Sequence, residues 1–116
     1  LVNIGDAMVR QEKLEKAVTY FERAIEQAPE DEVLPFNVAE IYFDQGNVDR
    51  AIEYYQRSAE VRPDWPEPHL KMGYAYLNLA QLDKAAEAFQ KVVEVAPPDS
   101  AQAQMAQAAL SALPQQ

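Results

Sequence analysis

Apolar residues recur along the chain with the spacing of an α-helix. Ala17, Phe21 and Ala24, for example, follow one another at intervals of four and three positions and share one helical face. Polar turns such as Asp-Gln-Gly-Asn-Val-Asp at 44–49 interrupt this pattern, and the glycine favours the left-handed backbone that ends a helix. We therefore predict an all-α protein, with helices near residues 1–11, 14–27, 32–44, 48–61, 67–79 and 82–95.

The predicted helices form units that repeat every 34 residues. Three kinds of position recur in each unit: a small residue in each helix, an aromatic residue in the second helix, and a proline after it. These positions are Gly5, Ala39 and Gly73; Ala17, Ala51 and Ala85; Phe21, Tyr55 and Phe89; and Pro29, Pro63 and Pro97. The small residues allow the two helices of a unit to approach closely, and the aromatic side chains fill the space around them. Such helical hairpins bury their apolar faces only by stacking.

The stacked hairpins lead to expectations about single residues. Phe89→Ala should cost about 3–5 kcal/mol because it leaves a cavity. Glu22, in contrast, is expected on a solvated face, where Glu22→Ala should change the free energy of unfolding very little.

The stretch Arg-Pro-Asp-Trp-Pro-Glu-Pro-His at 62–69 resembles a flexible linker or a Pro-x-x-Pro ligand. Pro63, however, has counterparts at the same place in both other units, and it ends the helix before it because proline lacks an amide hydrogen. Pro66 and Pro68 fall before or within the first turn of the next helix, where that hydrogen is not needed. We interpret the stretch as a stiff corner inside one continuous fold.

A last helix is predicted over about residues 99–113, with Asp99 or Ser100 as its N-cap. Gln107 stands in this helix at the position that holds glycine or alanine in the three units. A bulky polar side chain is tolerable there only where no second helix packs against it. We therefore interpret this helix as the cap of the array.

Charge and composition exclude several classes of partner. The 116 residues contain 19 Asp and Glu against 10 Lys and Arg, and the net charge of −9 repels nucleic-acid phosphates and anionic lipids. No apolar run approaches the roughly 18 residues that span a bilayer, so we expect no membrane insertion. The absence of cysteine excludes disulfides and zinc–cysteine sites, and leaves the compartment, cytoplasmic or periplasmic, open.

The sequence offers little for catalysis. His69 is the single histidine and stands at a helix start, where partial burial is the simplest interpretation. Acidic pairs such as Glu12 and Glu15 belong to turns and solvated faces, and no glycine-rich phosphate loop or nucleophile–base pattern occurs. We expect no enzyme activity, no metal site and no cofactor.

With these residues in place, the chain resembles the tetratricopeptide repeat family, most closely in Pro-Phe-Asn-Val-Ala-Glu-Ile-Tyr-Phe-Asp-Gln-Gly-Asn-Val-Asp-Arg-Ala-Ile-Glu-Tyr-Tyr at 35–55. The resemblance covers residues 1–98. It implies a right-handed superhelical α-solenoid of three helix-turn-helix units, at about 1–31, 32–65 and 66–99, closed by a capping helix in a single domain over 1–116. Because the sequence starts without methionine and already in helical register, we expect a fragment of a longer protein.

The resemblance also implies a function: such arrays are scaffolds that bind proteins, and here we expect a module of a bacterial assembly, secretion or regulatory protein. In this family the first helices of the units line a concave groove that holds a peptide or a partner helix. The groove-facing residues carried over to this chain are Val2, Asn3, Asp6, Val9, Arg10, Phe36, Asn37, Glu40, Phe43, Asp44, Leu70, Lys71, Tyr74, Leu77 and Asn78. The apolar members form two stripes, the first of Val2, Phe36 and Leu70 and the second of Val9, Phe43 and Leu77, flanked by Asp6, Glu40 and Asp44. This arrangement suggests a ligand with apolar anchors and basic character.

One subgroup of the family grips the terminal carboxylate of chaperone tails with five polar and basic residues. Asn37 and Lys71 match that pattern, whereas Val2, Asp6 and Glu67 do not. Two of the three departures place negative charge where the carboxylate would lie, and repulsion there is worth about 1 kcal/mol or more. We do not expect chaperone tails as ligands.

Self-association is the alternative function. Leu1, Ile4 and Met8 form an apolar edge at the first unit, and an uncovered edge of a repeat array favours docking onto another copy. The partner would then be a second chain, in a homodimer.

Overall fold

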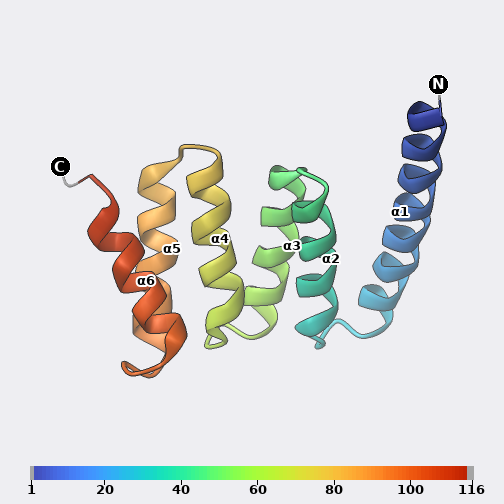
Figure 1. Ribbon diagram of the computed structural model, residues 1–116. Coiled ribbons are helices and arrows are strands. Elements are labelled where there is room, and N and C mark those ends of the chain that lie inside the picture. The colour runs from blue at the N-terminus through green and yellow to red at the C-terminus, as the bar shows by residue number, and fades with distance from the viewer. Residues whose placement is uncertain (1, 115–116) are drawn as a thin grey trace.

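The structure, a computed structural model, describes the backbone of residues 2–114 and the side chains of residues 12–114. This part of the chain contains helices and short connections without strands, which confirms the all-α prediction (Figure 1). The helices are α1 (Val2–Gln27), α2 (Val33–Asp44), α3 (Val48–Val61), α4 (Pro66–Asn78), α5 (Leu82–Val95) and α6 (Ala101–Ala112).

The helices predicted from residue 32 onward are confirmed. α3 and α5 begin and end at the predicted residues, and α2, α4 and α6 differ from the prediction by one or two residues at their ends. Ser100 is the N-cap of α6, because its Oγ accepts a hydrogen bond from the Ala103 amide at 3.1 Å. Side-chain capping of this kind typically contributes about 1 kcal/mol to helix stability.

The prediction of two helices near 1–11 and 14–27 is wrong. α1 is a single helix of 26 residues, and residues 12–14, where the turn was predicted, are helical. In Figure 1, α1 stands as a single long helix at one end of the molecule, whereas α2 with α3 and α4 with α5 form hairpins.

The turn chemistry explains why α1 continues. The turns of the next two units contain residues with positive φ, Gly46 at 81° and Ala80 at 58°. The equivalent residue of the first unit is Glu12, for which a left-handed backbone costs roughly 1–2 kcal/mol. Lys13 follows where Asn47 caps α3 with its side chain, and lysine has no acceptor for that bond. Both residues are good helix formers, so the straight helix is the less costly local conformation.

The hairpins stack side by side, with α1 at one end and α6 at the other (Figure 1). The molecule extends over 47 × 36 × 22 Å, and its shortest dimension is that of about two helix diameters. A hairpin of this thickness cannot enclose a core alone, so each hairpin buries its apolar side chains against its neighbours in the stack.

The core consists of the residues that recur in the repeat. Tyr55 and Phe89 are fully buried, as are Ala39, Ala51 and Ala85 around them. The close approach of the two helices in the last unit depends on a glycine, because a Cβ built on Gly73 would lie 2.5 Å from Cε1 of Phe89. The sequence-based roles of the small and aromatic positions are thus confirmed in the second and third units.

The proline-rich corner is rigid and packed, as predicted. Trp65 is the N-cap of α4, and its indole lies against the Phe36 ring with the centroids 5.0 Å apart. His69 Nε2 lies 2.9 Å from the carbonyl oxygen of Pro63, to which it donates. The single histidine of the chain therefore links the first turn of α4 to the connection before it.

Polar contacts also join neighbouring units. Glu22 on α1 accepts hydrogen bonds from the Tyr54 hydroxyl and from Arg57 Nη1, the latter at 3.0 Å. The expectation that Glu22 lies on a solvated face is wrong, because its half-buried carboxylate connects α1 to α3. The buried Ser58 hydroxyl donates to the carbonyl oxygen of Glu32 at 2.7 Å and ties α3 to the start of α2.

Candidate binding groove

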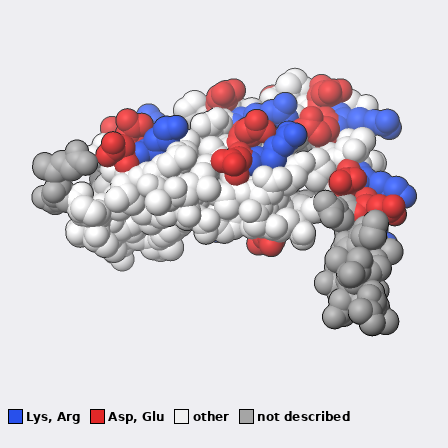
Figure 2. Space-filling model, turned by 90° about the horizontal axis from the view of Figure 1, so that it is seen from above, with Lys and Arg blue, Asp and Glu red and all other residues white. Residues whose placement is uncertain are grey.

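Charge is distributed unequally among the helices. α3 and α5 each contain five charged residues, whereas α2 and α4 contain two each and α6 contains none. Figure 2 shows the acidic and basic side chains gathered along one edge of the molecule, and the opposite side largely free of them. The first helices of the units thus present the less charged surface, on which apolar contacts can form.

The ten predicted groove residues on α2 and α4 differ in their exposure. Asn37, Asp44 and Asn78 are exposed, and Leu70 is buried at 4%. The remaining six are half-buried: Phe36, Glu40, Phe43, Lys71, Tyr74 and Leu77. The other five predicted members, Val2, Asn3, Asp6, Val9 and Arg10, lie outside the residues whose side chains the structure describes.

Phe36 and Leu70, the two described members of the first predicted stripe, pack against the core. Leu70 packs in a cluster with Phe89 and Val92. Phe36 lies edge-on to Tyr55 at 5.6 Å between ring centroids and also contacts Trp65. The sequence pattern identified the correct helical face, but neighbouring side chains cover these two positions.

Phe43 and Leu77, the two members of the second predicted stripe whose side chains the structure describes, are partly accessible. Phe43 and Leu77 each pack against a core cluster with one side and expose the other. Between them on α4, Tyr74 lies edge-on to Phe89, with ring centroids 5.2 Å apart. Core residues pack against the inner side of these three side chains and fix their positions. A ligand would therefore contact an apolar surface that is already formed.

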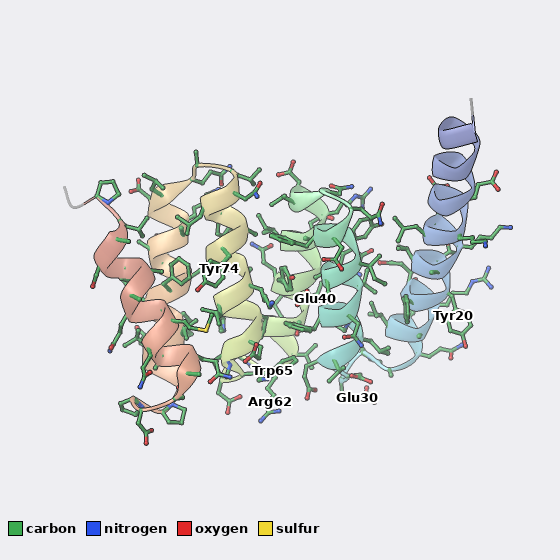
Figure 3. The ribbon with its side chains drawn as sticks, viewed as in Figure 1. Tyr20, Glu30, Glu40, Arg62, Trp65 and Tyr74 are labelled. Carbon is green, nitrogen blue, oxygen red and sulfur yellow. The ribbon has the colours of Figure 1, made fainter. Side chains whose placement is uncertain are left out.

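An ion pair crosses this surface. Glu40 on α2 and Lys71 on α4 lie 3.5 Å apart, and both are partly exposed. Glu40 and Tyr74 mark the two helices in Figure 3. Burial, followed by the negative charges of Glu40 and Asp44, raises the pKa of the Tyr55 phenol below them. Tyr55 therefore stays neutral, and its hydroxyl acts as a hydrogen-bond donor in this part of the molecule.

The described residues contain no group of three or more His, Cys, Asp or Glu side chains that could hold a metal ion. Among the helices of this part of the chain, none is both long and apolar enough to cross a bilayer.

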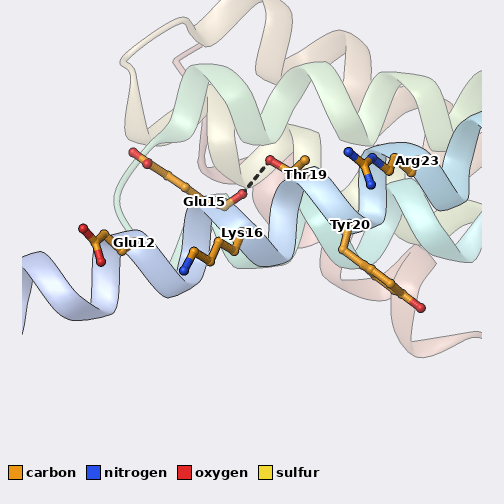
Figure 4. A pocket seen from close by; sticks show the side chains of 6 residues that line it. All are labelled: Glu12, Glu15, Lys16, Thr19, Tyr20 and Arg23. Atoms are coloured by element: carbon orange, nitrogen blue, oxygen red, sulfur yellow. Dashed lines mark hydrogen bonds between the residues drawn. The ribbon is translucent and has the colours of Figure 1, made fainter.

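A second surface feature was not predicted from the sequence. A shallow hollow on α1 is lined by Glu12, Glu15, Lys16, Thr19, Tyr20 and Arg23. In Figure 4 the Tyr20 ring projects outward from α1. The alignment of the repeats could have identified Tyr20 as a residue of interest. Its equivalent in the second unit, Tyr54, is buried, whereas Tyr20 is exposed.

The fold has close counterparts among solved structures. The second TPR domain of human RPAP3, determined in complex with the HSP70 peptide SGPTIEEVD, is 22% identical with a TM-score of 0.71, and the match covers 94% of this chain and 88% of that one. The Arabidopsis OM64 TPR domain gives a TM-score of 0.71 at 20% identity, over 92% and 88% of the two chains. The Sgt2 TPR domain from Aspergillus fumigatus gives 0.70 at 22% identity, over 92% and 70%.

No curated protein matches the sequence. Family models, in contrast, match along most of its length. The models described as "Tetratricopeptide repeat" match residues 1–31 and 66–99, and the model described as "TPR repeat" matches residues 39–79. Together with the stacked helical hairpins and the recurring small and aromatic residues, these matches show that the chain belongs to the tetratricopeptide repeat family.

Proposed function

We propose that this chain is a non-enzymatic scaffold that binds a peptide segment or a helix of a partner protein along α2 and α4. The observation that carries the proposal is the group of partly accessible apolar side chains, Phe43, Tyr74 and Leu77, on α2 and α4, which contain fewer charged residues than α3 and α5. Half-buried aromatic and aliphatic side chains of this kind are typical anchors of helix-in-groove and extended-peptide recognition. The second TPR domain of human RPAP3, which was determined in complex with an HSP70 peptide, has the same fold, and this supports a peptide-binding scaffold.

The charges around the stripe favour a ligand with basic character. Asp44 is exposed at one end of the stripe, and Glu40 has a single modest ion-pair contact at 3.5 Å. A lysine or arginine of the ligand can therefore pair with either carboxylate, in a groove that carries little other charge. The net charge of −9 steers the approach of such a ligand.

The same charges disfavour an acidic chaperone tail. Glu67 is oriented by a hydrogen bond from Gln102 Nε2 at 2.6 Å, and it is one of the positions at which this chain departs from the pattern of that subgroup. We expect the peptide SGPTIEEVD to bind far more weakly than a basic, apolar peptide of the same length, because its carboxylates would meet Glu67 and Glu40.

Isothermal titration with a library of basic, apolar peptides tests the proposal. Phe43→Ala should weaken the best binder by about tenfold or more, because it removes a partly desolvated anchor. Leu82→Ala is the matched control: it truncates an exposed apolar side chain on α5 and should leave the affinity unchanged. If no peptide binds, or if binding is indifferent to Phe43, the groove proposal is wrong.

The charge preference is tested separately. Glu40→Gln should weaken a peptide that contains a central lysine more than the same peptide with norleucine at that position. Equal effects on both peptides would contradict the assigned role of Glu40.

Self-association is a second candidate function. The edge of Leu1, Ile4 and Met8, for which it was predicted, lies outside the residues whose side chains the structure describes. The exposed Tyr20 ring on the same helix favours this candidate. Light scattering over a range of concentrations tests it, and a strict monomer would exclude it.

A further inference from the structure

A hollow lies between the last turns of α1 and α3, beside the connection from α1 to α2. Its floor is apolar and consists of Ile25, Pro35 and Val61. Pro35 is fully buried, and Ile25 and Val61 are half-buried, so packing against the rest of the molecule fixes the floor. The hollow has a volume of about 490 Å³, within the range of about 300–1,000 Å³ that is usual for ligand sites. It can therefore accept an aliphatic side chain of a partner.

The rim of this hollow is acidic. Glu30 and Asp31 line it from the connection, and Glu60 lines it from α3. Glu30 marks the place in Figure 3. Glu30 and Glu60 are exposed, whereas Asp31 is half-buried and accepts a hydrogen bond from the Val33 amide at 2.9 Å. The two exposed carboxylates can therefore turn toward a ligand.

The hollow is also lined by a cation, Arg57, whose charge is already compensated. Its Nη1 lies 3.0 Å from the Glu22 carboxylate on α1, and its guanidinium lies 4.9 Å from the centre of the Tyr54 ring. Among the described residues, no lysine or arginine forms an ion pair with the three rim carboxylates. The rim therefore keeps a negative charge that a ligand can neutralise.

The equivalent joint between the second and third units lacks this excess of negative charge. One repeat further along, Asp64 and Glu94 replace the two exposed carboxylates. Asp64 Oδ1 lies 3.7 Å from Arg62 Nε, and Glu94 Oε2 lies 3.6 Å from Lys91 Nζ. In the first unit the position of Arg62 is held by Ala28, which carries no charge. The acidic rim is therefore a property of the first joint and not of the repeat in general.

We propose that this hollow is a docking site for an extended segment of a partner protein, in which basic residues stand two positions before and after an aliphatic residue. Side chains two positions apart in an extended segment point the same way. The aliphatic side chain fills the apolar floor, and the two cations pair with Glu30 and Glu60. The site is formed by α1, α3 and the connection between α1 and α2, so it is distinct from the groove on α2 and α4 and does not depend on it.

Methyl NMR of the whole chain tests the site with the peptide acetyl-Lys-Ala-Leu-Ala-Lys-amide. We expect the methyl signals of Ile25 and Val61 to shift and to saturate as the peptide is added. The same peptide with glutamate in place of both lysines should leave these signals unchanged, because its carboxylates meet the acidic rim. If the signals of Ile25 and Val61 stay in place, or shift equally with the acidic peptide, the site does not exist. The methyl signals of Leu77 report the groove on α2 and α4, so the two proposals succeed or fail separately.

Matched variants at equivalent positions of the repeat test the two parts of the site. With Ile25 as the reporter, Glu60→Lys and Val61→Ala should each raise the Kd of the basic peptide by about threefold or more. Glu94→Lys and Val95→Ala make the same changes one repeat further along and should leave the Kd unchanged. Glu60 is exposed, so its substitution leaves the fold intact. Equal effects of Glu60→Lys and Glu94→Lys would show that only the net charge attracts the peptide, and this would overturn the proposal.

Discussion

The distance between the two helices of the last unit depends on Gly73. A methyl group there would meet the fully buried Phe89 ring, whose Cε1 lies 2.5 Å from the Cβ position. In general, alanine favours a helix over glycine by about 1 kcal/mol, whereas overpacking a core costs about 1–3 kcal/mol. At this position the steric effect is therefore the larger of the two.

We predict that Gly73→Ala lowers the free energy of unfolding by up to about 2 kcal/mol, the difference between these two effects. Urea denaturation followed by circular dichroism measures it. Gln90→Ala, at an exposed position of α5, is the control and should change stability by less than about 0.5 kcal/mol. A Gly73→Ala variant more stable than the wild type would show that the helices can separate at little cost.

Tyr55 makes the free energy of unfolding depend on pH in the alkaline range. Its raised pKa means that the folded state holds the phenol neutral, while the unfolded phenol ionises near pH 10. The stabilisation is complete below about pH 10 and is lost as the pH rises beyond it. Thermal unfolding at pH 8 and pH 11 should show a smaller loss for Tyr55→Phe than for the wild type. Tyr20→Phe, which removes a hydroxyl from the surface, is the control, and equal losses for both variants would contradict the role of Tyr55.

At the scale of elements, the turns decide which hairpins close. Gly46 adopts φ 81° without a steric penalty, whereas Ala80 adopts φ 58° with its side chain in place. The third unit closes in spite of this, because α4 and α5 have packing partners on both sides, α3 and α6. The tertiary contacts of α4 and α5 therefore offset the conformational cost of the left-handed backbone at Ala80.

We predict that Ala80→Gly stabilises the protein by about 1 kcal/mol, because it relieves the left-handed backbone. The measurement is the midpoint of urea unfolding at constant m-value. Ala86→Gly, inside α5, is the matched control and should destabilise by about 1 kcal/mol. If both substitutions destabilise, the strain assigned to Ala80 does not exist.

The sequence predicted these elements well where periodicity alone determines them. Five helices and the packed corner at Trp65 were predicted, because proline and the 34-residue repeat mark the same boundaries in each unit. The straight course of α1 was not predicted, because alignment shows that Glu12 is equivalent to Gly46 but not whether packing compensates for a poor turn. Leu70 was assigned to the groove for a similar reason, since a helical face does not reveal how deeply its neighbours bury it.

At the scale of the whole molecule, the stability of each helix depends on its contacts with the next helix in the stack. α6 covers the end of α5 through Ala103 and Ala106, which are fully buried against Val92 and Ala96. A nearest-neighbour array loses stability throughout when one interface is weakened. The small side chains of α6 thus contribute to the folding of helices that they do not touch.

We predict that Ala103→Asp lowers the thermal midpoint of the entire helical signal, because it buries a carboxylate without a partner. Gln104→Asp places the same charge one residue further, on the exposed side of α6, and should have little effect. Circular dichroism melting curves compare the two. Similar midpoints would show that α6 is dispensable for the stack.

The ion pair between Glu40 and Lys71 has a consequence for affinity. It joins α2 and α4, the first helices of two adjacent units, across a distance of 3.5 Å. If a cation of a ligand pairs with Glu40, as proposed above, it competes with Lys71 for the same carboxylate. Binding would then exchange a contact between two units for a contact with the ligand, and the net gain in affinity from this charge would be smaller than that of a free carboxylate.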